Sequence, residues 1–191
     1  MIIGITGGIG SGKSMVCKEL RAMGYPVYDT DKEAKNLIMH QSHVHQQIEQ
    51  LFGPEVFANG VYQTAWVAQQ VFANPSLLAE LNAIVHPAVR EDICRWAEEQ
   101  TGAEWLFVEC AILYEAGMDV LCDKVVCVGA PEELRIERVI ARDKSDINKV
   151  RARMRAQKAE EYEQRADIVL NNNGQKSIPT LCQELIAHLQ K

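Results

Sequence analysis

The sequence lacks long hydrophobic runs, closely spaced cysteine pairs and an excess of basic residues. No apolar stretch approaches the ~18 residues of a membrane-spanning helix, and the chain opens on a short apolar segment and a glycine-rich loop, so neither membrane insertion nor secretion is indicated. The net charge of −6 and pI near 5.4 argue against a nucleic acid or an anionic membrane as a partner bound through bulk charge. The six cysteines are scattered and form no C-x-x-C pair, which is typical of a reduced, cytoplasmic protein.

The distribution of apolar segments predicts one α/β domain with an insertion. A chain of 191 residues is long enough for one such domain and short for two independent ones. Short apolar runs alternate with helical patterns, which favours a mostly parallel sheet with ligands at the carboxyl ends of its strands. The five predicted strands are Ile2–Ile5, Pro26–Tyr28, Trp105–Cys110, Lys124–Val128 and Ile168–Leu170.

The first predicted strand leads into a phosphate-binding pattern. Gly7 to Ser14 read G-G-I-G-S-G-K-S, which fits G-x-x-x-x-G-K-[ST]. The glycines let successive N–H groups form an anion-binding nest, Lys13 supplies a cation for the β- and γ-phosphates, and the Ser14 hydroxyl supplies a ligand for Mg²⁺. A helix should follow and end at Gly24. A glycine-rich turn without a ligand is the alternative, which this context disfavours. The predicted ATP-binding residues are Gly8, Gly10, Ser11, Gly12, Lys13, Ser14 and Met15.

About 75 residues separate the second and third predicted strands, far more than a crossover helix requires. This length predicts an inserted helical region. Asn74-Pro75 is typical of a helix cap followed by proline at the first helical position, and His86-Pro87 is predicted to restart a helix that runs to Gln100.

A basic segment follows the fourth predicted strand, from Pro131 to Lys158. Ser145 is the predicted N-cap that divides it into two helices. For most of its arginines a solvated helix face is the favoured interpretation, because acidic residues are interleaved. For at least one of them a functional role is favoured, because phosphoryl transfer calls for an arginine beside the negative charge of the transferred phosphoryl group. The arginines are Arg135, Arg138, Arg142, Arg151, Arg153 and Arg155.

Three classes of P-loop protein could carry such a loop. A GTPase would show D-x-x-G and N-K-x-D elements; neither occurs, since Asn148-Lys149 is followed by Val150-Arg151. A motor-type or regulatory ATPase would carry adjacent acids after a strand, whereas the third strand ends in Glu109 alone, which keeps this class possible but weak. A small-molecule kinase needs a carboxylate for its acceptor hydroxyl, and Asp29 and Asp31 follow the second strand. Their spacing would put both on one side of an extended segment, although one of them could instead cap the next helix.

Together these residues resemble the dephospho-CoA kinase family over nearly the whole chain. The departures from its pattern are modest: Met15, Thr30, Lys35 and Ala111 stand where threonine, alanine, arginine and proline are usual. The segments that carry the resemblance are the opening I-T-G-G-I-G-S-G-K-S, Asp29-Thr30-Asp31, L-N-A-I-V-H-P at 81–87, I-L-Y-E at 112–115, Arg142-Asp143 with Gln157, and the A-D-x-V-x-x-N run from Ala166 to Asn172.

The resemblance implies a P-loop NTPase-type three-layer fold and a defined reaction. The γ-phosphoryl group of ATP would pass to the ribose 3′-hydroxyl of dephospho-CoA, with Mg²⁺, in the final step of coenzyme A synthesis. It also implies a core of about 1–31, 103–131 and 159–191, a helical CoA-binding insertion of about 32–102, and a lid of about 132–158 that closes over ATP to exclude water.

The expected site follows from the motifs and the resemblance together. Lys13, Asp31 and Arg142 are the predicted catalytic residues, with Asp31 rather than Asp29 facing the 3′-hydroxyl. Asp29, Asp31, His86 and Glu115 are the predicted substrate-binding residues, and Ser14 is the predicted metal ligand. His86 stands about evenly between a structural and a substrate-contacting role. The expected partner is the small molecule dephospho-CoA, with no nucleic acid and no membrane; nucleotide preference and oligomeric state, monomer or weak oligomer, stay open.

Overall fold

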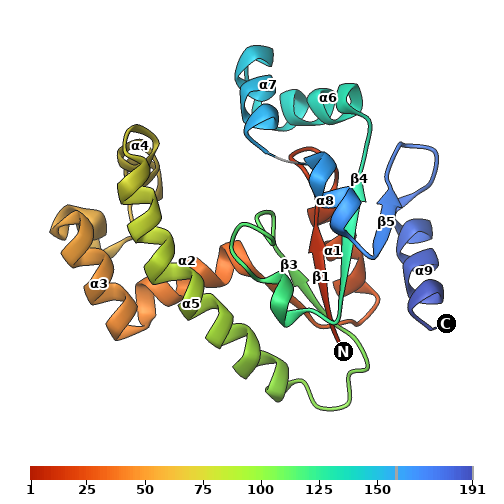
Figure 1. Cartoon of the computed structure of the whole chain (residues 1–191), viewed down its shortest axis with the longest axis horizontal. Helices are drawn as coiled ribbons and strands as arrows, with labels where there is room; N and C mark the ends of the chain where they lie inside the picture. The colour runs from red at the N-terminus through yellow and green to blue at the C-terminus, as the bar shows by residue number, and fades with distance from the viewer. Residues whose placement is uncertain (158, 191) are drawn as a thin grey trace. The chain divides into compact units, whose positions relative to one another are not determined.

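A computed structural model describes residues 1–157 and 159–190, which form two compact units (Figure 1). The core unit comprises Met1–Tyr28 and the chain from Gln100 onward, and the helical unit comprises Asp29–Glu99. Lys158, which closes the predicted basic segment, lies outside the described residues. In the part of the chain that is described, no helix has both the length and the apolar character needed to cross a bilayer.

The core unit is built on a five-stranded sheet in the order β2-β3-β1-β4-β5. Strand β1 is central and pairs in parallel with β3 and β4, and β4 pairs in parallel with β5. Ile3, Ile5 and Phe107 are fully buried, as expected for parallel strands covered on both faces. All five predicted strands are confirmed: β1 Ile2–Thr6, β2 Val27–Asp29, β3 Leu106–Glu109, β4 Lys124–Gly129 and β5 Ile168–Asn171.

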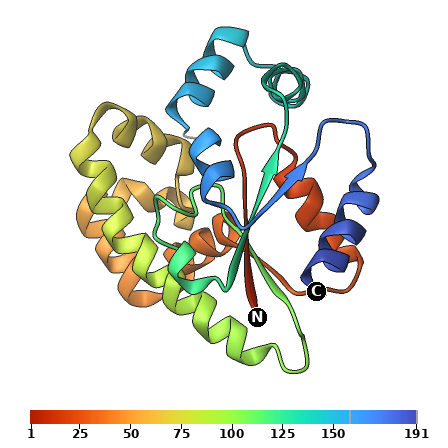
Figure 2. The same cartoon turned by 45° about the vertical axis from the view of Figure 1, so that its right-hand side comes forward.

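Helices α1 (Lys13–Ala22) and α9 (Ile178–Leu189) lie side by side and share one hydrophobic core with the sheet (Figure 2). Leu20 of α1 and Leu185 of α9 are both buried in that core. Helix α1 ends as predicted at Gly24, whose φ of 92° is the left-handed conformation that favours glycine after a helix. The helix that begins at the P-loop is therefore anchored along its length.

The basic segment after β4 forms α6 (Glu132–Asp143) and α7 (Ile147–Ala156), and α8 (Ala159–Arg165) leads to β5; the short 3₁₀ helix η2 (Asp119–Leu121) precedes β4. A small second core of Ile136, Val139, Val150 and Met154 joins α6 to α7, and Ile9 of the P-loop packs against it. The predicted cap at Ser145 is wrong. Asp146 caps α7, because its Oδ1 accepts from the N–H groups of Asn148 (2.8 Å) and Lys149 (3.4 Å), and a carboxylate also suits the positive end of the helix dipole.

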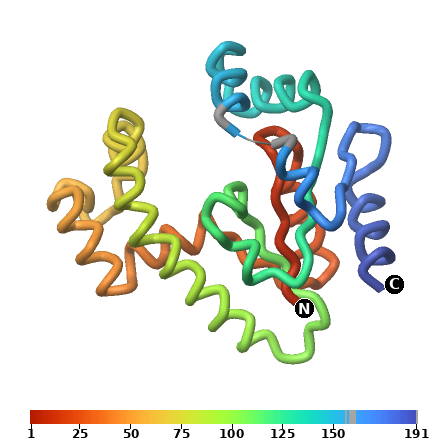
Figure 3. Tube along the Cα trace, viewed as in Figure 1, coloured from red at the N-terminus to blue at the C-terminus, as the bar shows by residue number. Residues whose placement is uncertain are grey.

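The helical unit contains α2 (Thr30–His40), α3 (Ser42–Phe52), the 3₁₀ segment η1 (Pro54–Gly60), α4 (Thr64–Ala73) and α5 (Pro75–Glu99). Leu37, Ile48 and Ile93 are buried where α2, α3 and α5 meet. Helix α4 runs beside the N-terminal part of α5 (Figure 3). Asn74 caps α5 as predicted, because its side-chain oxygen accepts from the N–H of Leu77 at 3.2 Å.

The predicted restart of a helix at His86-Pro87 is wrong, because α5 is continuous from Pro75 to Glu99 with Pro87 inside it. An internal proline removes one helical hydrogen bond and costs about 3 kcal/mol. Ala88, Val89 and Ile93, which follow it on the same helix, are all buried. Burial of one large aliphatic side chain contributes roughly 1.5–3 kcal/mol, so packing of this face offsets the cost of the proline.

Candidate active site

The P-loop lies between β1 and α1, and several of its glycines have backbone conformations that residues with a side chain rarely adopt. Gly10 has φ 80° and Gly12 has φ 95°. Helix α1 starts directly after the loop, and the carbonyl of Gly12 accepts from the N–H groups of Met15 (3.0 Å) and Val16 (3.1 Å). Gly12 provides no side-chain cap, so the first turn of α1 presents its N–H groups as an anion-binding end.

Lys13 and Ser14 both contact the carboxylate of Glu109, a buried residue at the end of β3. The Lys13 Nζ lies 2.8 Å from Glu109 Oε1, and Arg21 Nη2 lies 3.7 Å from Oε2. Burial raises the pKa of Glu109, but the charge and hydrogen bond of Lys13, a hydrogen bond from Ser14 and the charge of Arg21 outweigh it, so its pKa is lowered overall. An ionised carboxylate therefore holds the two residues predicted to bind phosphate and Mg²⁺.

Three side chains from the end of α7 and from α6 hold the outer side of the P-loop. Gln157 Oε1 accepts from the N–H of Ile9 at 2.7 Å, and Arg135 Nε donates to the Ile9 carbonyl at 2.9 Å. Arg138 Nη1 donates to the carbonyl of Ser11 at 3.3 Å. A Cβ on Gly10 would lie 2.5 Å from the Arg135 carbonyl, so the close approach of α6 depends on this glycine.

Arg142, the arginine that the sequence favoured, lies in the last turn of α6. Its Nε and Nη2 donate to Asp143 at 2.6 and 3.0 Å, and its side chain is 62% exposed. Arg153 of α7 lies 3.5 Å from the same carboxylate. Contact between Arg142 and phosphate therefore stays a prediction, whereas Arg135 and Arg138 already bind the P-loop backbone.

Glu115 lies in the turn that follows β3 and is exposed. The Tyr162 hydroxyl of α8 donates to its Oε1. Next to it, the Arg165 guanidinium lies 3.7 Å from the centre of the Tyr114 ring and its Nη2 lies 3.1 Å from Asp119 Oδ2. Helix α8 thus orients the turn that carries Glu115.

Asp29 and Asp31 belong to the helical unit and do not share an extended segment, so that expectation is wrong. Asp29 is the last residue of β2 and the N-cap of α2, where its Oδ1 accepts from the N–H of Lys32 at 3.1 Å. Because this cap lets the helix begin at Thr30, Asp31 lies in the first helical turn, where it is exposed. The alternative in which one aspartate caps the next helix is correct for Asp29.

His86 lies on α5 and is half-buried. Burial lowers its pKa, and the nearby charge of Arg90 lowers it further, so the imidazole is held in its neutral form.

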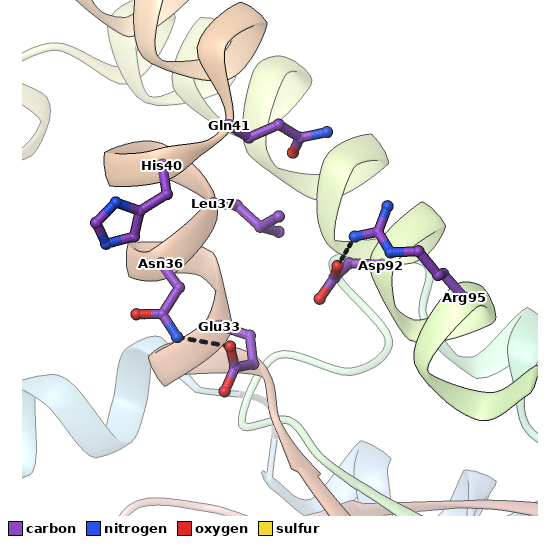
Figure 4. A pocket seen from close by; sticks show the side chains of 7 residues that line it. All are labelled: Glu33, Asn36, Leu37, His40, Gln41, Asp92 and Arg95. Atoms are coloured by element: carbon purple, nitrogen blue, oxygen red, sulfur yellow. Dashed lines mark hydrogen bonds and ion pairs between the residues drawn. The ribbon is translucent and has the colours of Figure 1, made fainter. Parts of the chain in front are cut away.

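A hollow of about 580 Å³ lies between α2 and α5 of the helical unit (Figure 4). Asp92 and Arg95 form an ion pair on its α5 side, and Asn36 donates to Glu33 at 2.6 Å on its α2 side. No motif in the sequence marks this hollow, and the helical spacing of three and four among its α2 residues is the signal that could have found it. Its lining consists of Glu33, Asn36, Leu37, His40, Gln41, Asp92 and Arg95.

Comparison with known proteins agrees with the motifs. The family model described as dephospho-CoA kinase matches residues 1–177. A dephospho-CoA kinase of Porphyromonas gingivalis is 43% identical over 159 residues, 83% of this chain and 78% of that protein. The crystal structure of TT1252 from Thermus thermophilus is 38% identical and aligns with a TM-score of 0.84 over 100% of this chain and 96% of that one. A shikimate kinase of Aquifex aeolicus, 19% identical with a TM-score of 0.54 over 100% and 96% of the two chains, shares the fold. The chain belongs to the dephospho-CoA kinase family.

Proposed function

We propose that this enzyme transfers the γ-phosphoryl group of ATP to the ribose 3′-hydroxyl of dephospho-CoA, giving coenzyme A and ADP. The observation that carries the proposal is the match to the dephospho-CoA kinase family over residues 1–177, which includes an intact P-loop. The same chemistry accounts for the anion-binding start of α1 and for the cation of Lys13 beside it.

In this proposal the P-loop N–H groups from Gly8 to Met15 bind the ATP phosphates. Lys13 leaves Glu109 for the β- and γ-phosphates as ATP enters. The oxygens of Ser14 and Glu109 suit Mg²⁺, which in such sites takes one or two protein oxygens together with phosphate and water oxygens. When bound, Mg²⁺ neutralises charge on the phosphate oxygens.

Asp31 accepts the proton of the 3′-hydroxyl in this proposal. Asp29 already accepts a backbone N–H as the cap of α2, whereas Asp31 is exposed in the first helical turn. A hydroxyl attacks phosphorus well only when its proton has an acceptor, so an exposed carboxylate is the better candidate. His86 and Glu115 are proposed to contact the dephospho-CoA molecule outside its reacting hydroxyl.

Helices α6 and α7 act as the proposed lid over ATP. Arg142 exchanges Asp143 for a phosphate oxygen when the lid closes, which stabilises the charge of the moving phosphoryl group and keeps water from it. A cytoplasmic location fits the free state of all six cysteines. The proposed partners are small molecules, and the enzyme acts as a monomer or weak oligomer without nucleic acid or membrane.

An ADP-release assay with ATP and Mg²⁺ tests the reaction against a panel of acceptors. The panel contains dephospho-CoA, nucleoside monophosphates, shikimate, gluconate and no acceptor. We expect turnover with dephospho-CoA alone. Comparable ADP release without acceptor would favour an ATPase, and turnover with shikimate or a nucleoside monophosphate would overturn the substrate assignment.

A further inference from the structure

Asn172 is the last residue of the A-D-x-V-x-x-N run, and it has no role in the proposed reaction. It directly follows β5 and is only 4% exposed. Its backbone N–H donates to the Gly129 carbonyl at 2.8 Å, at the end of the pairing of β5 with β4. Because a buried amide side chain must have partners, the direction of this side chain is informative.

The Asn172 side chain contacts the backbone of the P-loop. Its Nδ2 donates to the carbonyl of Ser11 at 2.8 Å. Arg138 Nη2 donates to the Asn172 side-chain oxygen at 3.3 Å and to its backbone oxygen at 3.2 Å, while Arg138 Nη1 donates to the same Ser11 carbonyl. Asn172 and Arg138 therefore hold each other and share one P-loop oxygen.

The consequence for phosphate binding follows from the geometry of the peptide bond. In a trans peptide the C=O of one residue and the N–H of the next point in opposite directions. Holding the Ser11 carbonyl outward therefore aims the Gly12 N–H toward the inside of the loop. Arg135 does the same two peptide planes earlier, because it holds the Ile9 carbonyl and so aims the Gly10 N–H inward.

The Asn172 side chain has room to reach Ser11 because Gly12 has no side chain. A Cβ on Gly12 would lie 2.3 Å from Asn172 Nδ2, so the amide packs directly against the Gly12 backbone. Gly12 is therefore needed for two reasons: its φ of 95° favours glycine, and a side chain at this position would clash with Asn172.

We infer that Asn172 is a positioning residue for ATP: with Arg138 it fixes the Ser11–Gly12 peptide so that the Gly12 N–H faces the phosphates. This role rests on the proposed binding of ATP at the P-loop. It concerns the triphosphate and not the acceptor, so it predicts a selective loss of ATP affinity when Asn172 is changed.

Calorimetric affinities for ATP–Mg²⁺ and for dephospho-CoA, measured on the full chain, test the inference. Asn172→Ala should weaken ATP binding about 10-fold, since the Ser11 carbonyl loses a buried hydrogen bond and the freed loop loses preorganisation. Dephospho-CoA affinity should stay within about twofold. In steady-state assays KM for ATP should rise while KM for dephospho-CoA does not.

Asn172→Asp separates the two contacts of the amide. The carboxylate keeps the shape and strengthens the pair with Arg138, but it replaces the donor to Ser11 by an acceptor that repels the carbonyl. ATP affinity should therefore fall at least as far as in Asn172→Ala. Wild-type ATP affinity in Asn172→Asp would overturn the inference, because the donor would then be dispensable.

Asn173→Ala is the matched control, since Asn173 accepts only a local bond from the Gln175 N–H at 3.0 Å in the described contacts. It should bind ATP like the wild type. Equal loss of ATP and dephospho-CoA affinity in folded Asn172→Ala would indicate a general structural role and also overturn the inference. If Asn172→Asp does not fold, Arg138→Met removes the second donor to Ser11 and must show the same selective loss. Wild-type enzyme that binds ATP yet phosphorylates no dephospho-CoA would refute the proposed reaction but leave this binding test intact.

Discussion

The P-loop and the Asp29–Asp31 segment both lie at the end of a strand, yet they are held in different ways. Four P-loop backbone groups form hydrogen bonds with side chains distant in the sequence: the N–H of Ile9 donates one, and the carbonyls of Ile9, Gly10 and Ser11 accept. In the aspartate segment the Asp29 side chain instead makes a local bond, as the acceptor from the Lys32 N–H. In the proposed reaction the P-loop acts through its backbone, which these distant side chains help to fix, whereas the proposed role of Asp31 needs a side chain that stays available to a proton.

The largest effect is expected in the aspartate segment. Asp31→Asn keeps the shape but loses the proton acceptor, so kcat should fall roughly 10²–10⁴-fold with little change in the affinities for ATP and dephospho-CoA. Calorimetry beside steady-state kinetics measures both. Asp29→Asn is the matched control: an asparagine still caps a helix, so kcat should change far less. Unchanged kcat in Asp31→Asn with a large loss in Asp29→Asn would reverse the assignment.

Lys13→Ala tests the P-loop side of the comparison. It removes a charge that strengthens its contact as the γ-phosphoryl group departs, so kcat/KM should fall on the order of 10²-fold or more. The same change leaves the buried Glu109 carboxylate without its 2.8 Å partner, which should also lower stability. Lys18→Ala, on the exposed side of α1, is the control that should change neither quantity much. Near-normal turnover in Lys13→Ala would refute the P-loop assignment.

Two arginines of α6 have different proposed roles: Arg142 contacts phosphate when the lid closes, and Arg138 holds the P-loop backbone. Arg142→Ala should lower kcat about 10-fold or more and leave ATP affinity nearly unchanged, because its proposed phosphate contact forms only in the closed lid. Arg138→Ala should instead weaken ATP binding, since Arg138 binds the Ser11 carbonyl. Arg151→Ala on exposed α7 should match the wild type. If Arg142→Ala matches it too while Arg138→Ala loses kcat alone, Arg138 is the arginine over the phosphoryl group.

Acid should weaken the core unit through Glu109. Its lowered pKa means that the unfolded chain binds the proton more readily, so the stabilisation is complete above the ordinary carboxyl pKa of 4.5 and is lost as pH falls through the lower folded value. Each unit of pKa difference corresponds to about 1.4 kcal/mol. Urea unfolding from pH 6 to pH 3 should show a steeper loss in the wild type than in Glu109→Gln. Parallel pH curves for the two would contradict this account.

The sequence predicted the parts of the core unit that depend on local pattern. Buried parallel strands read as short apolar runs, and the P-loop has its own spacing, so the five strands and the loop were identified. Pro87 was misread because its cost is local while the compensation, burial along α5, is tertiary. Asn172 and Arg138 gave no local signal of their role, because their P-loop partner Ser11 lies 161 and 127 residues away in the sequence. Residues that fix a backbone from outside are therefore the hardest to find from sequence alone.

The smallest effect is expected where α8 supports the turn after β3. Tyr162→Phe removes the donor to Glu115 but keeps the ring, which packs 5.7 Å from Tyr114, so the fold should lose only about 1 kcal/mol. Glu115 without this donor is less well oriented, and KM for dephospho-CoA should rise about two- to fivefold with ATP affinity unchanged. Glu115→Gln keeps an acceptor for Tyr162 and removes the charge, so it separates orientation from charge. Glu115→Ala removes the acceptor itself, so in a double-mutant cycle of Tyr162→Phe with Glu115→Ala on KM, additive effects would show that Tyr162 does not act through Glu115.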